Sequence, residues 1–234
     1  MIQFYTPLLL PERERRNHLL KSFKSRLENY LAHIRVYGLY SLYKRGYLFE
    51  MGWFESFRTK EAIDRQGQPI PWITYPCLTF LAGRIDPGLT VFEYGCGNST
   101  LWWAERVAKV VSCEHDRPWY EHVVPLIPAN VELKHVPLVY GGEYCQQVAK
   151  YQDEFDVVFI DGRDRVNCAK HALAALKTGG VVIFDNSDLS DYEEARQFLH
   201  AHGYRRIDFV GPGPITYATW QTSIFYKDNN CLGI

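Results

Sequence analysis

The sequence predicts an α/β fold with a mostly parallel sheet, preceded by a helical extension. Three observations support this prediction. From residue 90 onward, short and nearly all-apolar segments alternate with helical segments, as in a sheet covered on both faces. A glycine-rich turn follows the first apolar segment. Four of the segments end in an acid, and right-handed crossovers bring such residues to one edge of the sheet.

The elements follow from local patterns along the chain. The predicted strands are residues 90–92, 110–113, 131–135, 155–160, 181–184, 206–210 and 223–226. Helices are expected to begin at residue 98 and to cover residues 119–126, 169–176 and 192–202. Residues 177–180, Lys-Thr-Gly-Gly, are expected to close the helix at 169–176.

The segment TVFEYGCGNST at residues 90–100 is the main functional motif. Its strand runs into Glu93, Gly95 and Gly97, and a helix opens directly afterwards. Glycines at such a turn let the backbone approach a ligand closely, and the helix start offers unpaired N–H groups. The next strand ends in Glu114, about where a ribose-binding carboxylate lies in a nucleotide-binding βαβ unit. The motif therefore predicts a nucleoside-bearing cofactor, with an ordinary strand-to-helix turn as the alternative.

The details of the motif distinguish between cofactors. The NAD fingerprint requires a third glycine where this chain has Thr100. An acid two residues before the first glycine, and a small hydroxyl residue after the second, resemble motif I of class I S-adenosylmethionine-dependent methyltransferases. The resemblance covers roughly residues 72–234. It implies their Rossmann-like fold, a mostly parallel seven-stranded sheet with a closing antiparallel hairpin, here around residues 211–214.

The resemblance also implies roles for individual residues. Glu93 would lie near the methionine amine of the cofactor, and Glu114 would bind the ribose hydroxyls, as suits a carboxylate facing a cation or a diol. His115 would flank the adenine. The residues expected to bind the cofactor are Glu93, Tyr94, Gly95, Gly97, Asn98, Ser99, Glu114, His115 and Asp161.

Two further segments, FDVVFIDGRDR at 155–165 and GGVVIFDNSD at 179–188, resemble the metal-dependent, catechol-type O-methyltransferases. The resemblance implies that Asp161, Asp185 and Asn186 are catalytic and hold Mg²⁺ through oxygen atoms. The metal would bind a substrate hydroxyl and lower its pKa. That family commonly has a lysine where this chain has Asp164.

Two other interpretations of these segments are open. Asp161 and the Asp185-Asn186 pair suit helix caps and turns. Alternatively, Arg163 and Arg165 bind a carboxylate or phosphate group of the substrate.

We therefore expect methyl transfer from S-adenosylmethionine to an oxygen atom of a small-molecule or saccharide-type acceptor. Arg163, Trp72 and Tyr75 are the expected substrate contacts, although aromatic residues such as Tyr75, Tyr94 and Trp102 also suit a hydrophobic core. Two rival functions are a nucleotide-dependent oxidoreductase and a non-catalytic cofactor-binding or interaction protein.

The N-terminal part has a different character. We expect a helical extension at residues 1–70 and the cofactor-binding domain at 71–234. Within residues 1–50 there are nine Lys/Arg against four Asp/Glu, and an apolar stripe recurs at helical spacing from Leu19 to Ile34. A basic amphipathic helix of this kind lies on an anionic membrane surface, or packs on its own domain or on a second subunit of a homodimer.

Composition limits the remaining possibilities. The net charge of −1 gives no general attraction to nucleic acid. The six cysteines form no CxxC pair, which is consistent with reduced thiols in a cytoplasm. If the basic N-terminal helix contacts a membrane, we expect the contact to be peripheral. The sequence shows neither a signal peptide nor an apolar segment long enough to cross a bilayer.

Overall fold

The computed structural model describes residues 12–33 and 36–234, and the chain divides into two compact units, Met1–Glu50 and Met51–Ile234. Residues 51–70, which the sequence assigned to the extension, thus belong to the second unit. They are tied to its C-terminal part, because the Trp53 indole N–H donates to the Thr216 carbonyl (2.8 Å) and the Ile215 amide donates to the Ser56 hydroxyl (3.0 Å).

The first unit consists of helices α1 (Glu12–His33), α2 (Val36–Arg45) and α3 (Tyr47–Glu50). The predicted apolar stripe falls mostly on α1, whereas Ile34 and residues 1–11 lie outside the described residues. Leu20, Phe23, Leu27 and Tyr30 of this stripe are exposed. In the described residues of either unit, no helix combines the length and the apolar character needed to span a membrane.

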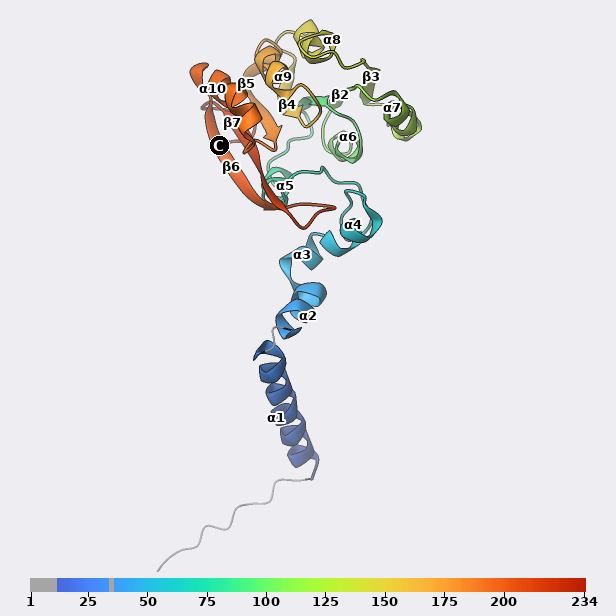
Figure 1. Cartoon of the computed structure of the whole chain (residues 1–234), viewed down its shortest axis with the longest axis vertical. Helices are drawn as coiled ribbons and strands as arrows, with labels where there is room; N and C mark the ends of the chain where they lie inside the picture. Colours follow the sequence, from blue (N-terminus) through green and yellow to red (C-terminus); the bar gives the residue numbers. More distant parts are fainter. Residues whose placement is uncertain (1–11, 34–35) are drawn as a thin grey trace, which may run out of the picture. The chain divides into compact units, whose positions relative to one another are not determined.

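The second unit is built on a seven-stranded sheet, which confirms the predicted fold class (Figure 1). The strands are β1 (Thr90–Tyr94), β2 (Lys109–Glu114), β3 (Val131–His135), β4 (Phe155–Ile160), β5 (Leu176–Asp185), β6 (Arg205–Pro212) and β7 (Thr219–Tyr226). Their order is β3-β2-β1-β4-β5-β7-β6, with β7 antiparallel to both neighbours and the other pairs parallel. The strand order reverses between β1 and β4, which is where open α/β sheets bind ligands.

Helices cover both faces of this sheet (Figure 1). Helices α8 (Glu143–Gln146), α9 (Arg165–Ala172) and α10 (Glu193–Ala201) lie on one face. Helices α5 (Tyr75–Ala82) and α6 (Asn98–Ala104) lie on the other. Helix α4 (Trp53–Thr59) precedes α5, and α7 (Arg117–Val123) follows β2; short 3₁₀ turns occur at Val124–Leu126, Val148–Lys150 and Ser190–Tyr192.

The helix predicted at residues 169–176 is misplaced. It lies at Arg165–Ala172 (α9), and residues 176–180, of which 177–180 were expected to close it, form the first half of β5. Gly179 has a φ of 81°, and a Cβ there would lie 2.7 Å from the Asn229 carbonyl oxygen. The glycine pair therefore marks an irregular strand entry beside the C-terminal segment, and a register shift in the β4–β5 pairing occurs at the same end.

Candidate cofactor and acceptor site

Side-chain alternation places three acids on the same face of the sheet. Phe92 and Tyr94 of β1 belong to the core beneath α8–α10, so Glu93 between them faces the opposite side. By the same alternation Asp161, directly after β4, and Asp185, at the end of β5, also face the side of α5 and α6. The sequence predicted that these acids share an edge, and the structure brings them together.

Glu93 is fully buried, with only part of its carboxylate satisfied. Its Oε2 accepts hydrogen bonds from the hydroxyls of Thr100 (2.5 Å) and Ser112 (2.8 Å). Within the described residues, its Oε1 is buried without a hydrogen-bond partner. Burial raises the pKa of Glu93 to about 7, although the neighbouring hydroxyls of Ser99, Thr100 and Ser112 oppose the rise. A buried oxygen without a donor costs about 1–3 kcal/mol, so this position suits a cationic ligand group.

The turn above Glu93 needs its glycines. Gly95 has a φ of 91°, and Gly97 has a φ of 154° with ψ −139°, a region open essentially only to glycine. Gly162, after β4, lies against this turn; a Cβ on it would be 2.2 Å from the Tyr144 hydroxyl oxygen. The backbones of the two loops therefore approach closely at the point where the strand order reverses. Asn98 holds the turn from the other side, since its side-chain Nδ2 donates a hydrogen bond to the Ala62 carbonyl at 2.8 Å.

Glu114 closes the same turn from β2. Its Oε2 accepts from the Cys96 amide (3.0 Å), and its Oε1 accepts from the amides of His115 and Asp116 (both 2.7 Å). A carboxylate has about four acceptor positions, so about one is left for a ribose hydroxyl. The His115 Nδ1 also lies 2.8 Å from Oε1. The structure confirms that this acid ends a strand, but the spacing in the sequence did not show that it also shapes the turn.

Trp119 is a site residue that the sequence analysis missed. Its indole N–H donates to the Cys96 carbonyl at 2.7 Å, and its ring would touch a Cβ on Gly97 at 3.4 Å. The Asp116 side chain caps α7 by accepting from the Trp119 amide (2.8 Å), which fixes where the ring emerges. Trp119 is 45% exposed and forms an aromatic wall beside the glycine turn. The Asp-Arg-Pro run before it, typical of a helix start, was the available signal.

The two acids on the acceptor side have different surroundings. The Oδ1 of Asp185 accepts from the Trp220 indole (2.8 Å) and the Thr222 hydroxyl (2.5 Å). Burial raises the pKa of Asp185 to about 6. The side chain of Asp161 is 22% exposed, and its Oδ1 lies 3.1 Å from the Arg165 guanidinium. Burial, followed by the charge of Asp185, holds the pKa of Asp161 well above its ordinary value even though Arg165 opposes the shift.

The proposed Mg²⁺ ligands do not fit a metal as they are arranged. Asp161, Asp185 and Asn186 do lie together, but the Arg165 guanidinium lies among them and donates to oxygen atoms of all three. In the described residues, no cluster of three or more His, Cys, Asp or Glu side chains suited to a metal occurs. Asp164, at the position of the catechol-type lysine, is also engaged, since it accepts from the Gly141 amide (2.8 Å) and the Asn167 side chain (2.7 Å).

The predicted aromatic contacts divide by burial. Tyr94 and Tyr75 are 0% exposed and Trp102 is 3% exposed, so all three belong to the core, and only the backbone of Tyr94 can meet a cofactor. Trp72, by contrast, is 48% exposed. Arg163 is also exposed and follows Asp161 and Gly162, directly beyond the acid at the end of β4. Trp72 and Arg163 therefore remain available to an acceptor, whereas the side chain of Tyr75 does not.

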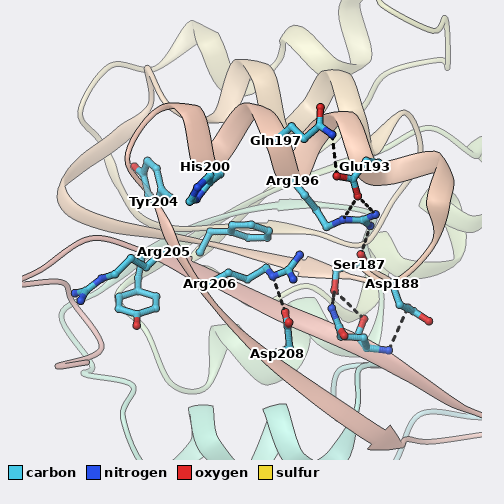
Figure 2. A pocket seen from close by; sticks show the side chains of 13 residues that line it. Ser187, Asp188, Glu193, Arg196, Gln197, His200, Tyr204, Arg205, Arg206 and Asp208 are labelled. Atoms are coloured by element: carbon cyan, nitrogen blue, oxygen red, sulfur yellow. Dashed lines mark hydrogen bonds and ion pairs between the residues drawn. The ribbon is translucent and has the colours of Figure 1, made fainter.

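A separate cavity of about 910 Å³ lies between α10 and the β6–β7 hairpin (Figure 2). Two pairs of its charged residues form ion pairs, Arg196 with Glu193 and Arg206 with Asp208. β6 is an edge strand, and charged side chains along such an edge prevent pairing with other chains. We therefore interpret the cavity as part of a protected sheet edge, which is distinct from the glycine turn.

Comparison with known proteins agrees with this geometry. A protein family described as a methyltransferase domain matches residues 92–187, from β1 to just beyond β5. No curated protein matches the sequence.

Two solved structures share the fold. A precorrin-6y C5,15-methyltransferase from Geobacter metallireducens has 16% identity and a TM-score of 0.52 over 65% of this chain and 87% of its own. A precorrin 8W decarboxylase from Methanobacterium thermoautotrophicum has 18% identity and a TM-score of 0.50 over 72% of this chain and 96% of its own. With the strand order, these likenesses show that the second unit of this chain shares the fold of these two proteins, and residues 92–187 resemble a methyltransferase domain.

Proposed function

We propose that this protein transfers a methyl group from S-adenosylmethionine to an oxygen atom of a small-molecule or saccharide-type acceptor. The observation that carries the proposal is the Oε1 of Glu93, which is buried near the end of β1 under the glycine turn and has no hydrogen-bond partner among the described residues. S-adenosylmethionine supplies a methyl group on a sulfonium and carries an ammonium, which a buried carboxylate suits.

Different residues around the turn would bind different parts of the cofactor. Gly95 and Gly97 would admit its body close to the backbone, with Asn98 and Ser99 opening α6 beside it. Glu114 would accept one ribose hydroxyl through the acceptor position that its three amide bonds leave. Trp119 and His115 would bound the adenine side, since His115 directly follows β2 and Trp119 lies in the first turn of α7. Each of these residues lies at the carboxyl end of β1 or β2, in the loop that follows it, or in the first turn of the next helix.

Asp161 is the residue of this chain best placed to act on the acceptor. It follows β4 next to the glycine turn and keeps a partly exposed carboxylate beside a buried, cationic Arg165. The raised pKa of Asp161 suits a general base, because a stronger base takes a hydroxyl proton more readily. The acceptor oxygen would lose its proton to Asp161 as it attacks the methyl carbon. Trp72 and the exposed Arg163 would bind the rest of the acceptor.

The test is a methyl-transfer screen that measures S-adenosylhomocysteine with hydroxyl-bearing sugars, phenols and amines as acceptors. We expect turnover with a hydroxyl acceptor and a loss of about 10²–10⁴-fold in Asp161→Asn, the usual contribution of general-base catalysis. Turnover with amines alone would contradict the oxygen target. Tight binding of NADH with none of S-adenosylmethionine would instead favour the oxidoreductase, and cofactor binding without turnover would favour the non-catalytic alternative.

For the first unit we propose contact with an anionic lipid surface. Helix α2 has no acidic residue and ends in Lys44 and Arg45, and its large apolar residues Leu39, Tyr40, Leu42 and Tyr43 are all exposed. Basic residues beside exposed aromatic and aliphatic side chains are typical of helices that lie in a membrane interface.

Sedimentation with vesicles tests this role. We expect binding to vesicles that contain phosphatidylglycerol, little binding to pure phosphatidylcholine, and a loss of binding in Lys44→Glu/Arg45→Glu. A dimer in analytical ultracentrifugation, with no vesicle binding, would show that a second copy covers these side chains instead. We also propose a reducing, cytoplasmic location, since the six cysteines are free thiols.

A further inference from the structure

Arg165 lies where the resemblance to catechol-type enzymes requires a divalent cation. The three oxygen-bearing residues that would bind Mg²⁺ are present, at the ends of β4 and β5. Mg²⁺ requires a near-octahedral set of oxygens at about 2.0–2.1 Å. In this protein two of the side-chain oxygens, Asp161 Oδ1 and Asn186 Oδ1, accept hydrogen bonds from a guanidinium group instead, and the Asp185 carboxylate lies 3.9 Å from it.

The hydrogen bonds of Arg165 are complete. Its Nε donates to the Gly162 carbonyl at 2.9 Å. Its Nη1 donates to the Asp185 carbonyl (2.5 Å) and to Asn186 Oδ1 (3.0 Å). Its Nη2 donates to the Asp161 carbonyl (3.0 Å) and to Asp161 Oδ1 (3.1 Å). A guanidinium has five N–H groups, and each of them has an acceptor here.

The charge of this group is permanent and largely removed from water. The side chain of Arg165 is 9% exposed, and its Nη1 lies 3.9 Å from Asp185 Oδ2 in addition to its contact with Asp161. Arginine does not lose its proton in proteins. A divalent ion at these oxygens would have to displace the buried guanidinium from its five acceptors, or lie beside it against like-charge repulsion.

The backbone conformation next to Arg165 favours the placement of its side chain among these acceptors. Asp164 adopts a left-handed conformation (φ 50°) and its side chain is fixed by Gly141 and Asn167. Arg165 is the first residue of α9, so the side chain turns back over the loop that contains Asp161 and Gly162. The Tyr192 ring covers the guanidinium, with its centroid 5.6 Å from Arg165 Cζ.

We propose that the Arg165 guanidinium takes the place of a metal ion in this chain: it holds Asp161, Asp185 and Asn186 together, leaves no divalent-cation site, and positions Asp161 toward the acceptor. The inference rests on the proposed function only for the role of Asp161. Metal binding is measured without any acceptor, so the inference can fail while methyl transfer stands, and the reverse also holds.

The first measurement is Mn²⁺ binding by electron paramagnetic resonance, with wild-type protein and S-adenosylhomocysteine. We expect no bound Mn²⁺ at millimolar metal. Arg165→Ala removes the internal cation and leaves its oxygen acceptors, so it should gain a Mn²⁺ site that is lost again in Arg165→Ala/Asp185→Asn. Arg163→Ala, in the same loop, is the matched control and should gain no site.

Wild-type binding of Mn²⁺ that Asp185→Asn abolishes would overturn the proposal. If Arg165→Ala does not fold, Arg165→Lys provides the second variant. A lysine has three N–H groups for five acceptors, so we expect a lower melting temperature and a pH–rate profile shifted relative to wild type. An unchanged profile and melting temperature in Arg165→Lys would contradict the positioning role, as would turnover that depends on added Mg²⁺ and stops in EDTA.

Discussion

The Ser112 hydroxyl donates a 2.8 Å hydrogen bond to the Oε2 of Glu93, joining β2 to β1 beneath the glycine turn. The two residues are register partners in the parallel pair, so the contact follows from the pairing of the strands. With Thr100, Ser112 satisfies one carboxylate oxygen and leaves the other without a donor in the described structure. Because one oxygen lacks a donor, the Glu93 carboxylate suits a cationic ligand group, and we expect the affinity of the site for such a ligand to depend on pH.

The affinity for S-adenosylmethionine should rise with pH between about 6 and 8. The pKa of Glu93 is raised to about 7, and only the ionised form attracts the cofactor's ammonium. With that pKa, about a tenth of the carboxylates are ionised at pH 6, so binding there should be about tenfold weaker than at pH 8. Calorimetric titration at several pH values measures the trend. Glu93→Gln should show weak binding that does not change over this interval; an equally steep trend in that variant would assign the titration to another group.

Glu93 should also reduce the stability of the ligand-free protein as pH rises. Its pKa in the folded state (about 7) lies above the ordinary value of 4.5, so the folded state holds the proton more tightly than the unfolded chain. The contribution of this proton is complete below pH 4.5 and is lost as pH rises through 7, by about 3 kcal/mol in the free energy of unfolding. Urea unfolding at pH 5 and 8 should show this loss in wild type and a smaller one in Glu93→Gln. A loss of the same size in both proteins would refute the assignment.

Gly162→Ala should destabilise the second unit. The new Cβ would lie 2.2 Å from the hydroxyl of Tyr144, a fully buried ring, and 3.0 Å from the carbonyl carbon of Tyr94. Overpacking of this kind costs about 1–3 kcal/mol, and the displaced turn should weaken cofactor binding as well. Gly83→Ala is the control, because nothing lies within 4 Å of its Cβ position. Equal melting temperatures of the two variants would show that the loops are not in close contact.

Glu114→Gln should weaken the binding of S-adenosylmethionine by about 1–3 kcal/mol, because a charge-assisted bond to the ribose is lost. It should also loosen the turn, since the carboxylate accepts from the amides of Cys96, His115 and Asp116. Hydrogen exchange at these amides separates the two effects. Glu154→Gln, which disrupts a partly exposed ion pair with Lys109, is the control. Unchanged affinity in Glu114→Gln would exclude this acid from the cofactor site.

Much of the fold could be predicted because the apolar strands and the acids that follow them have strong sequence patterns. The pattern predicted all seven strands, and the order of the acids along the chain predicted their common edge. The entry to β5 could not be predicted, because glycines at 179 and 180 usually end a helix and only the nearby Asn229 shows why they continue a strand. The boundary of the first unit depended on contacts such as Trp53 with Thr216, which no local pattern contains.

The sequence predicted the residues of the glycine turn but not the position of Arg165, because local patterns do not contain long-range contacts. Glu93, Gly95, Gly97 and Glu114 follow a spacing that reflects one turn and one strand pair. Arg165 was considered only as an anion-binding residue, because a sequence does not show whether an arginine turns toward substrate or back onto carbonyls of its own loop. The five acceptors around it come from two separate backbone segments, one directly after β4 and one at the end of β5, and only the fold assembles them.

The most direct test of the account is calorimetric titration of the wild-type protein and of Glu93→Gln with S-adenosylmethionine at pH 8, with NADH as the comparison ligand. If Glu93 binds the cofactor's ammonium, we expect micromolar binding of S-adenosylmethionine to the wild type and no binding of NADH. The affinity of Glu93→Gln for S-adenosylmethionine should be lower by about 5–150-fold, the equivalent of 1–3 kcal/mol. Equal affinity of wild type and Glu93→Gln for S-adenosylmethionine, or binding of NADH alone, would contradict it.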